Sequence, residues 1–156
     1  MVRAMTRILV TGGAGYVGSV SVEAFLAAGH SVVVLDDLTT GHRNAVPDGA
    51  QLHIGSYADG TEVAKLLSDE GIEAILHCAA RSLVGESIAH PARYFRDNVA
   101  GGVALLEAAR EVGVDRVSSR RRRPSTGSRT PRRSRKTRPS GRSTRTVRPS
   151  ARSRVP

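Results

Sequence analysis

Three glycines near the start of the chain have the spacing of a turn that holds phosphate groups. Gly12, Gly15 and Gly18 form a G-x-x-G-x-x-G pattern between the apolar run Arg7–Val10 and the helix-like segment Tyr16–Ala28. Such a turn needs a tight bend at the first glycine, bare backbone near a pyrophosphate at the second, and close contact between helix and strand at the third. The free N–H groups and the positive end of the helix dipole would face the phosphates. We therefore expect a pyrophosphate to bind here.

A pair of carboxylates follows the second apolar run. Asp36 and Asp37 come directly after Ser31–Leu35, about 20 residues beyond the glycine turn. A carboxylate at this distance accepts hydrogen bonds from the ribose hydroxyls of adenosine and repels a 2′-phosphate. The two residues could also be an ordinary surface pair after a strand. Together with the glycine turn they favour a site for NAD, and favour NAD over NADP.

The segments around these residues alternate between strand and helix patterns. The predicted strands are Arg7–Val10, Ser31–Leu35, Gln51–Ile54, Ile72–Ala79 and Val114–Val117, and the predicted helices are Tyr16–Ala28, Thr61–Ser68 and Arg93–Val112. Apolar strands separated by helices predict a parallel sheet that is covered on both faces. The expected fold is an incomplete Rossmann-like, doubly wound α/β sheet of four to five strands. If the last strand does not form, the fourth becomes an exposed apolar edge.

The net charge of +10 is concentrated at the C-terminal end of the chain. Residues 1–117 hold 9 basic and all 14 acidic side chains, whereas residues 118–156 hold 15 basic side chains and no acidic one. The second segment is almost entirely Arg, Ser, Thr and Pro, so it has too little apolar surface to offset the conformational entropy lost on folding. We expect a partial NAD-binding domain over residues 1–117 and a disordered tail over residues 118–156.

The composition excludes several other classes of protein. A single cysteine, Cys78, rules out a disulfide framework and a four-cysteine zinc site, and the five histidines have no metal-ligand spacing. We expect Cys78 to be a packing residue and His77 to be satisfied by a local partner. No apolar run reaches the roughly 18 residues of a membrane span. Strand-like sequence begins within a few residues of the N-terminus, so we expect no signal peptide and a cytoplasmic location.

Three stretches of the chain resemble the extended short-chain dehydrogenases, the NAD-dependent epimerase/dehydratase family. They are Ile8–Ser19, Val34–Arg43 and His77–Ser87, and Asn98–Gly101 resembles the start of that family's next long helix. The resemblance covers residues 5–117 and is greatest to the members that invert C4 of a UDP-hexose. It implies NAD as cofactor, a nucleotide-sugar substrate, a homodimer for intact members, and interconversion of UDP-glucose and UDP-galactose by transient hydride transfer to NAD. The alternatives are another NAD-dependent nucleotide-sugar epimerase or dehydratase, and a non-catalytic NAD- or nucleic-acid-binding protein.

The resemblance also implies further contacts to the cofactor. They are backbone contacts from the first helix, a ribose-side loop, an adenine-side pair after the third strand, a wall after the fourth strand, and an Asn that fixes this wall. In that order the residues are Tyr16, Val17, Thr39, Thr40, Gly41, Ser56, Tyr57, Cys78, Ala79, Ala80, Ser82 and Asn98. Two places depart from the family pattern. Ser56 and Tyr57 stand where an Asp and an aliphatic residue are usual, and Ser82 stands where some relatives have Lys.

The catalytic set that the resemblance implies is missing from the chain. It comprises a Ser or Thr after the fifth strand and a Tyr-x-x-x-Lys pair whose Tyr takes the proton of the sugar 4-hydroxyl. None of the three tyrosines, Tyr16, Tyr57 and Tyr94, is followed four residues later by a lysine. We therefore predict no catalytic residue in this chain and expect it to be inactive alone.

A shift of reading frame would explain the basic tail. One consistent set of codons for Ser118–Gly127, regrouped one nucleotide earlier, encodes V-F-S-S-T-A-A-V-Y-G, which resembles the family's next strand. The same regrouping lets Thr144–Ser150 encode N-P-Y-G-P-S-K, which contains a Tyr-x-x-x-Lys pair. The competing interpretation is a genuine Arg/Ser-rich tail that binds nucleic acid. Its charge would bind phosphate backbones non-specifically, and it has no aromatic residue on which bases could stack.

Overall fold

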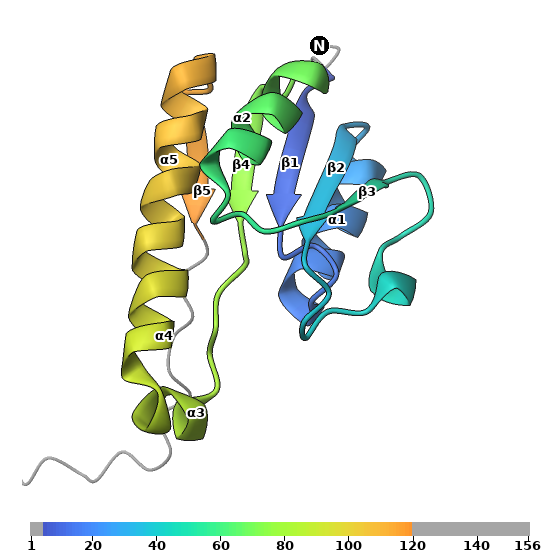
Figure 1. Cartoon of the computed structure of the whole chain (residues 1–156). Coiled ribbons are helices and arrows are strands. Elements are labelled where there is room, and N and C mark those ends of the chain that lie inside the picture. Colours follow the sequence, from blue (N-terminus) through green and yellow to red (C-terminus); the bar gives the residue numbers. More distant parts are fainter. Residues whose placement is uncertain (1–4, 120–156) are drawn as a thin grey trace, which may run out of the picture. The chain divides into compact units, whose positions relative to one another are not determined.

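The computed structural model describes residues 5–119 (Figure 1). The predicted tail beyond Ser119 lies outside the described residues. The elements are β1 (Arg7–Thr11), α1 (Tyr16–Ala27), β2 (Ser31–Asp36), a 3-10 turn (Arg43–Ala45), β3 (Gln51–Ile54), α2 (Gly60–Asp69), β4 (Ala74–His77), α3 (Val84–Ala89), α4 (Pro91–Phe95), a π-helical turn (Arg96–Ala100), α5 (Gly101–Val112) and β5 (Arg116–Ser119). No helix among these residues is both long and apolar enough to cross a membrane.

The five strands form one parallel sheet in the order β3-β2-β1-β4-β5. The strand order reverses between β1 and β4, which is where ligands bind in open α/β sheets. The register brings the carboxyl ends of the central strands together: Thr11 of β1 lies opposite Leu35 of β2 on one side and His77 of β4 on the other. The glycine turn, the carboxylates and the predicted wall therefore leave the sheet at one edge.

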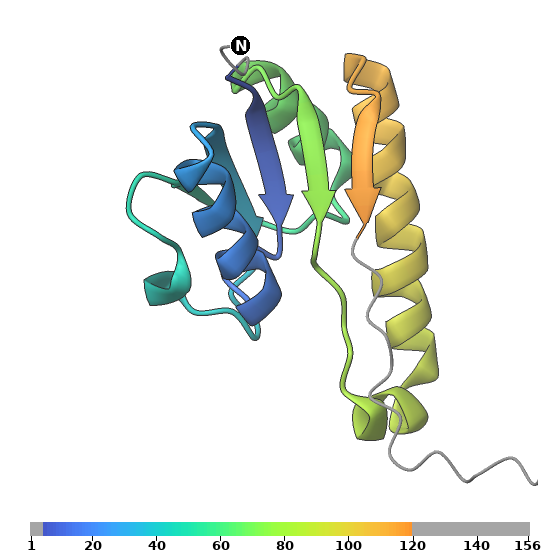
Figure 2. The same ribbon diagram turned by 180° about the vertical axis from the view of Figure 1, so that it is seen from behind.

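Alternate residues of the central strands enter two separate cores. Leu9, Val33 and Ile75 point to the face that α2 and α5 cover, and each is almost completely buried. Val10 and Val34 point to the opposite face, where α1 packs. Figures 1 and 2 show α1 behind the sheet in one view and in front of it in the other. Burial on both faces explains why β1 and β2 are continuous apolar runs, and it confirms the predicted doubly wound architecture.

The fifth strand forms, as predicted, so the condition under which β4 would become an exposed edge is not met. β5 pairs with β4 along its whole length, with Val117 opposite Ile75 and Ser119 opposite His77. The strand begins at Arg116, two residues later than predicted, and runs two residues past Val117, where the predicted strand ends. Ladder hydrogen bonds from β4 hold Ser118 and Ser119 in the strand although their side chains are exposed.

Two other elements differ from their predicted bounds. The fourth strand, Ala74–His77, is shorter than the predicted Ile72–Ala79 at both ends, and Ala79 lies close to Gly12 in the loop that follows. The predicted helix over Arg93–Val112 is the π-helical turn and α5 together with most of α4, and it stops at Gly113, whose φ of 85° favours glycine. The short helix α3 was not predicted, since its residues are mostly exposed and carry no apolar stripe.

Candidate functional site

The first glycine of the turn is fixed by both its conformation and its surroundings. Gly12 has φ of 72°, and a Cβ at this position would lie 2.6 Å from the main-chain N of Ala79. Its N–H donates a 2.8 Å hydrogen bond to the carbonyl of Leu35. The bend at Gly12 thus packs closely against the loop after β4, and a hydrogen bond links it to the end of β2.

The other glycines of the turn have separate roles. A Cβ at Gly18 would collide with the main-chain O of Gly12, so this glycine lets the start of α1 lie directly on the turn. A Cβ at Gly15 would meet one atom outside its chain neighbours, the Gly12 carbonyl O at 3.4 Å, so its backbone faces open space. Gly13 is a requirement that the pattern missed, because a Cβ there would lie 2.6 Å from the side chain of Val34. Bare backbone at Gly15 is the feature that a pyrophosphate needs.

Asp36 is buried and holds the glycine turn in place. Its side chain is 8% exposed. One carboxylate oxygen accepts the N–H of Ala14 at 3.0 Å, and the other accepts the N–H of Leu38 at 2.9 Å. A carboxylate has about four acceptor positions, so these two bonds leave room for ribose hydroxyls. Sequence reasoning missed Ala14, which acts through its backbone alone.

The loop after Asp36 combines an exposed rim with a tightly packed glycine. Its exposed members are Asp37, Thr39 and Thr40. Asp37 accepts the N–H of Thr39 at 2.9 Å and so shapes the rim. A Cβ at Gly41 would lie 2.9 Å from Oδ1 of Asp36 and 2.9 Å from Cβ of Ala14. Gly41 therefore closes the loop against the carboxylate, and its predicted contact with the ribose stays a prediction.

The predicted wall after β4 is held by Asn98 from the π-helical turn. The side-chain O of Asn98 accepts the N–H of Arg81 at 2.8 Å, and its side-chain N donates to the carbonyl of Arg81 at 3.0 Å. The Arg81 guanidinium also forms an ion pair with Asp97, which raises the pKa of Arg81. Within the wall, the predicted residues half-buried in the structure are Cys78 and Ala79, and the exposed ones are Ala80 and Ser82.

The predicted adenine-side pair divides into an exposed and a half-buried residue. Ser56 is exposed, and its hydroxyl accepts the N–H of Ala58 at 3.2 Å. Tyr57 is half-buried, and its hydroxyl donates to the main-chain O of Asp97 at 2.7 Å. Burial, followed by the nearby Asp97 carboxylate, raises the pKa of Tyr57. The phenol is therefore protonated at neutral pH and can act as a donor.

His77 lies beneath the glycine turn and has a local partner, as the sequence predicted. Its Nδ1 is 2.7 Å from the hydroxyl of Thr11, which is completely buried. The edge of the Tyr57 ring meets the imidazole, with ring centroids 4.9 Å apart and planes at 65°. Burial lowers the pKa of His77, which favours the neutral imidazole.

The helix that begins the predicted pyrophosphate site has an open N-terminus. Gly15 is the residue before α1, and no side chain caps this end of the helix. Tyr16 is 87% exposed and Val17 is half-buried, and both belong to the first turn of α1. An uncapped helix N-terminus favours anionic groups.

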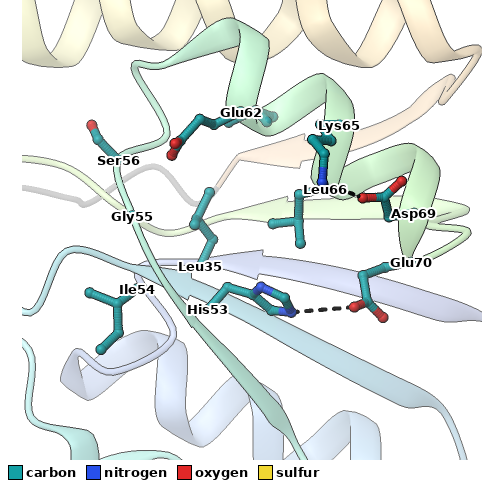
Figure 3. Close-up of a pocket in the computed structure, with 11 residues that line it drawn as sticks. Leu35, His53, Ile54, Gly55, Ser56, Glu62, Lys65, Leu66, Asp69 and Glu70 are labelled. Atoms are coloured by element: carbon teal, nitrogen blue, oxygen red, sulfur yellow. Dashed lines mark hydrogen bonds and ion pairs between the residues drawn. The ribbon is translucent and has the colours of Figure 1, made fainter.

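A hollow of about 240 Å³ lies elsewhere, between β3 and α2 (Figure 3). Of the predicted site residues it includes only Ser56, and neither the glycine turn nor Asp36 lines it. Two of its three carboxylates have basic partners: Glu70 lies 3.4 Å from His53, and Asp69 lies 2.9 Å from Lys65. It is a groove beside the sheet, and only Ser56 of the predicted cofactor site lines it.

Similarity to known proteins covers most of the chain. Residues 8–130 match the family described as the NAD dependent epimerase/dehydratase family. A UDP-glucose 4-epimerase of Corynebacterium glutamicum is 48% identical over 111 residues, which cover 71% of this chain and 33% of that protein.

Two solved structures have the same arrangement of elements. A UDP-glucose 4-epimerase from Brucella ovis in complex with NAD matches with a TM-score of 0.70 and 35% identity, over 73% of this chain and 35% of that one. A UDP-glucose 4-epimerase with UDP-glucose from Thermotoga maritima matches with a TM-score of 0.70 and 32% identity, over 73% of this chain and 37% of that one. The chain thus spans about a third of the length of such relatives.

Proposed function

Since the chain belongs to the NAD dependent epimerase/dehydratase family, we propose that residues 5–119 form the greater part of an NAD-binding site. The observation that carries the proposal is the pairing of bare backbone at Gly15 with the buried carboxylate of Asp36. The first suits a pyrophosphate and the second suits the adjoining ribose. The NAD complex of the Brucella ovis relative supports the choice of cofactor.

Each part of the site has a distinct task in this proposal. The backbone of Gly15, Tyr16 and Val17 receives the pyrophosphate at the open end of α1. The unused acceptor positions of Asp36 take the ribose hydroxyls, and its negative charge disfavours the 2′-phosphate of NADP. The segment Cys78–Ser82, held by Asn98, forms the wall beside the dinucleotide. Ser56 replaces the usual acid on the adenine side, so a hydroxyl is available there in place of a charge.

We further propose that the reaction of the intact protein is the interconversion of UDP-glucose and UDP-galactose. When bound, NAD would supply reversible hydride transfer at C4 of the sugar. The identity to UDP-glucose 4-epimerases and the UDP-glucose complex of the Thermotoga maritima relative support this substrate class. The stretches Val34–Arg43 and His77–Ser87 favour it over other nucleotide-sugar epimerases and dehydratases.

The chain itself would bind the cofactor without turnover. It has no Tyr-x-x-x-Lys pair, because no lysine stands four residues after Tyr16, Tyr57 or Tyr94. Tyr57 and Tyr94 are moreover engaged with the protein: one hydroxyl bonds Asp97 and the other bonds Leu83. A cytoplasmic location fits an activity that uses NAD and nucleotide sugars.

A second copy of the chain is the partner we propose for the long helix. Phe95, Val99, Val103 and Leu106 recur every three to four residues, and each is at least 46% exposed. Such spacing gathers side chains on one side of a helix, and an exposed apolar stripe of this kind marks an interaction surface. Light scattering should give a dimer for the chain, and the substitution Val103→Glu should shift it toward monomer. A monomer at micromolar concentration would contradict the dimer without touching the cofactor proposal.

The cofactor proposal is tested by ligand selectivity. NAD and ADP-ribose should raise the melting temperature of the full chain, while NADP at the same concentration should raise it less. No UDP-glucose should be converted to UDP-galactose in the presence of NAD. Equal shifts by NAD and NADP would contradict the role of Asp36, and measurable turnover would contradict the absence of a catalytic residue.

A further inference from the structure

Tyr57 connects two sides of the proposed cofactor site. It follows β3, yet its hydroxyl bonds the main-chain O of Asp97, 40 residues away in the sequence. The same side chain lies against His77 at the end of β4. It is also packed closely against the start of α5, since a Cβ at Gly101 would lie 3.0 Å from its ring. Tyr57 is thus positioned by three separate elements.

The hydroxyl acts on the wall of the site through a single residue. Asp97 is followed by Asn98, whose side chain makes both hydrogen bonds to the backbone of Arg81. The carbonyl that Tyr57 holds therefore belongs to the same π-helical turn that carries Asn98. If this turn shifts, Asn98 shifts with it, and so does the segment around Arg81 to which Asn98 is hydrogen-bonded. That segment includes Ala79, which touches Gly12 of the glycine turn.

The ring acts on the glycine turn by a second route. It rests on His77, whose imidazole contacts the buried hydroxyl of Thr11. Thr11 immediately precedes Gly12. Both routes from Tyr57 therefore end at the bend that would receive the pyrophosphate. A phenol is already protonated at neutral pH, and burial raises the pKa of Tyr57 further, so the donor of the first route is present.

We propose that Tyr57 is a positioning residue for the cofactor: its hydroxyl fixes the Asp97–Asn98 turn, and Asn98 thereby keeps the Cys78–Ser82 wall against the glycine turn. This inference rests on the proposed binding of NAD. It differs from the contact with adenine that the family resemblance implies. The positioning role of the hydroxyl is lost when that group is removed, whereas a contact with adenine depends on the ring.

The substitution Tyr57→Phe separates these roles because it removes the hydroxyl and keeps the ring. Isothermal titration of the full chain with NAD and with AMP would measure the effect on the whole site and on the adenosine part alone. Loss of one hydrogen bond should weaken NAD binding about threefold to tenfold, while the affinity for AMP stays within twofold of wild type. Ser87→Ala, which removes a hydroxyl bonded to the Val84 carbonyl in α3, is the control and should leave both affinities unchanged.

NMR spectroscopy shows whether the loss of the Tyr57 hydroxyl reaches the wall through Asn98. In Tyr57→Phe the side-chain amide signals of Asn98 and the backbone amide signal of Arg81 should move in the NMR spectrum, and in Ser87→Ala they should stay. Unchanged NAD affinity with unmoved Asn98 signals would overturn the inference, as would a fall in AMP affinity equal to that for NAD. A Tyr57→Phe chain that no longer folds would also overturn it, by showing a role in general stability. Failure of the wild-type chain to bind NAD would instead reject the proposed function.

Discussion

The carboxylate of Asp36 lies 3.0 Å from the main-chain N of Ala14, in the middle of the glycine turn. This bond links the end of β2 to the loop that follows β1, so the proposed ribose acceptor and the proposed pyrophosphate site form one unit. A carboxylate that served only the ribose would not need this bond. The residue therefore contributes both to the shape of the site and to the binding of a ligand in it.

Replacement of Asp36 by Ala should consequently lower stability as well as affinity. It leaves the N–H of Ala14 without its buried acceptor, which costs about 1 to 3 kcal/mol in the free energy of unfolding. Asp36→Asn keeps an acceptor and should cost less. Chemical denaturation measures stability, and titration with NAD measures binding. If Asp36→Ala keeps full stability and full NAD affinity, neither task belongs to this residue.

Two glycine substitutions should change stability in opposite directions. A Cβ at Gly18 meets the Gly12 backbone, so Gly18→Ala should destabilise the chain by about 1 to 3 kcal/mol. Gly102 lies inside α5 with nothing within 4 Å of an added Cβ, so Gly102→Ala should stabilise it by about 1 kcal/mol. Thermal melting of both variants checks the prediction. Equal effects of the two would mean that helix propensity, and not the close approach to the turn, decides the outcome.

His77 should make stability depend on pH. Burial lowers the pKa of His77 in the folded chain below its ordinary value of 6.5. As the pH falls through 6.5 the unfolded chain takes up a proton that the folded chain does not, so the free energy of unfolding decreases until the folded pKa is passed. Above this range the contribution is constant. Urea unfolding between about pH 5 and pH 8 measures the slope.

The substitution His77→Gln should flatten this slope, because an amide does not titrate. His90→Gln replaces an exposed histidine and serves as the matched control that keeps the wild-type slope. A slope that survives in His77→Gln would assign the pH dependence to other groups.

The order of the elements and the glycine turn could be predicted from the sequence because both depend on local patterns. Gly12, Gly15 and Gly18 are fixed by their spacing between a strand and a helix, and the apolar runs of β1 and β2 reflect burial on both faces of the sheet. The same reasoning found Asp36 from its distance to the turn. These features require only neighbouring residues to be considered together.

The contacts that organise the wall could not be predicted in this way. Two of these contacts join segments that are distant in the sequence. Tyr57 and Asp97 are 40 residues apart, and Asn98 and Arg81 are 17 residues apart. Neither follows from a period or a composition, since each depends on where the chain returns to the edge of the sheet. Ala14 was missed for another reason: it contributes a backbone N–H, which any residue type except proline could supply.

The DNA after the codon for Val117 should contain a second, longer reading frame. We predict that a shift of one nucleotide there restores a strand of the type V-F-S-S-T-A-A-V-Y-G and, further on, a Tyr-x-x-x-Lys pair. Sequencing of the gene across codons 115–120 and downstream checks this directly. Codons for Ser118–Gly127 that cannot encode this strand in the shifted frame would leave the basic tail as a genuine part of the protein.

Titration of the folded chain with NAD tests the central claim most directly, and Gly15→Ala makes it specific to the turn. Wild type should show saturable binding of one NAD per chain. Gly15→Ala should remain folded, because the added Cβ meets no protein atom closer than 3.4 Å, yet bind NAD roughly tenfold more weakly, since the methyl group occupies the space of the pyrophosphate. Circular dichroism would confirm that both proteins are folded. A folded wild-type chain that gives no saturable signal, or a Gly15→Ala variant that binds NAD as tightly as wild type, would contradict the account.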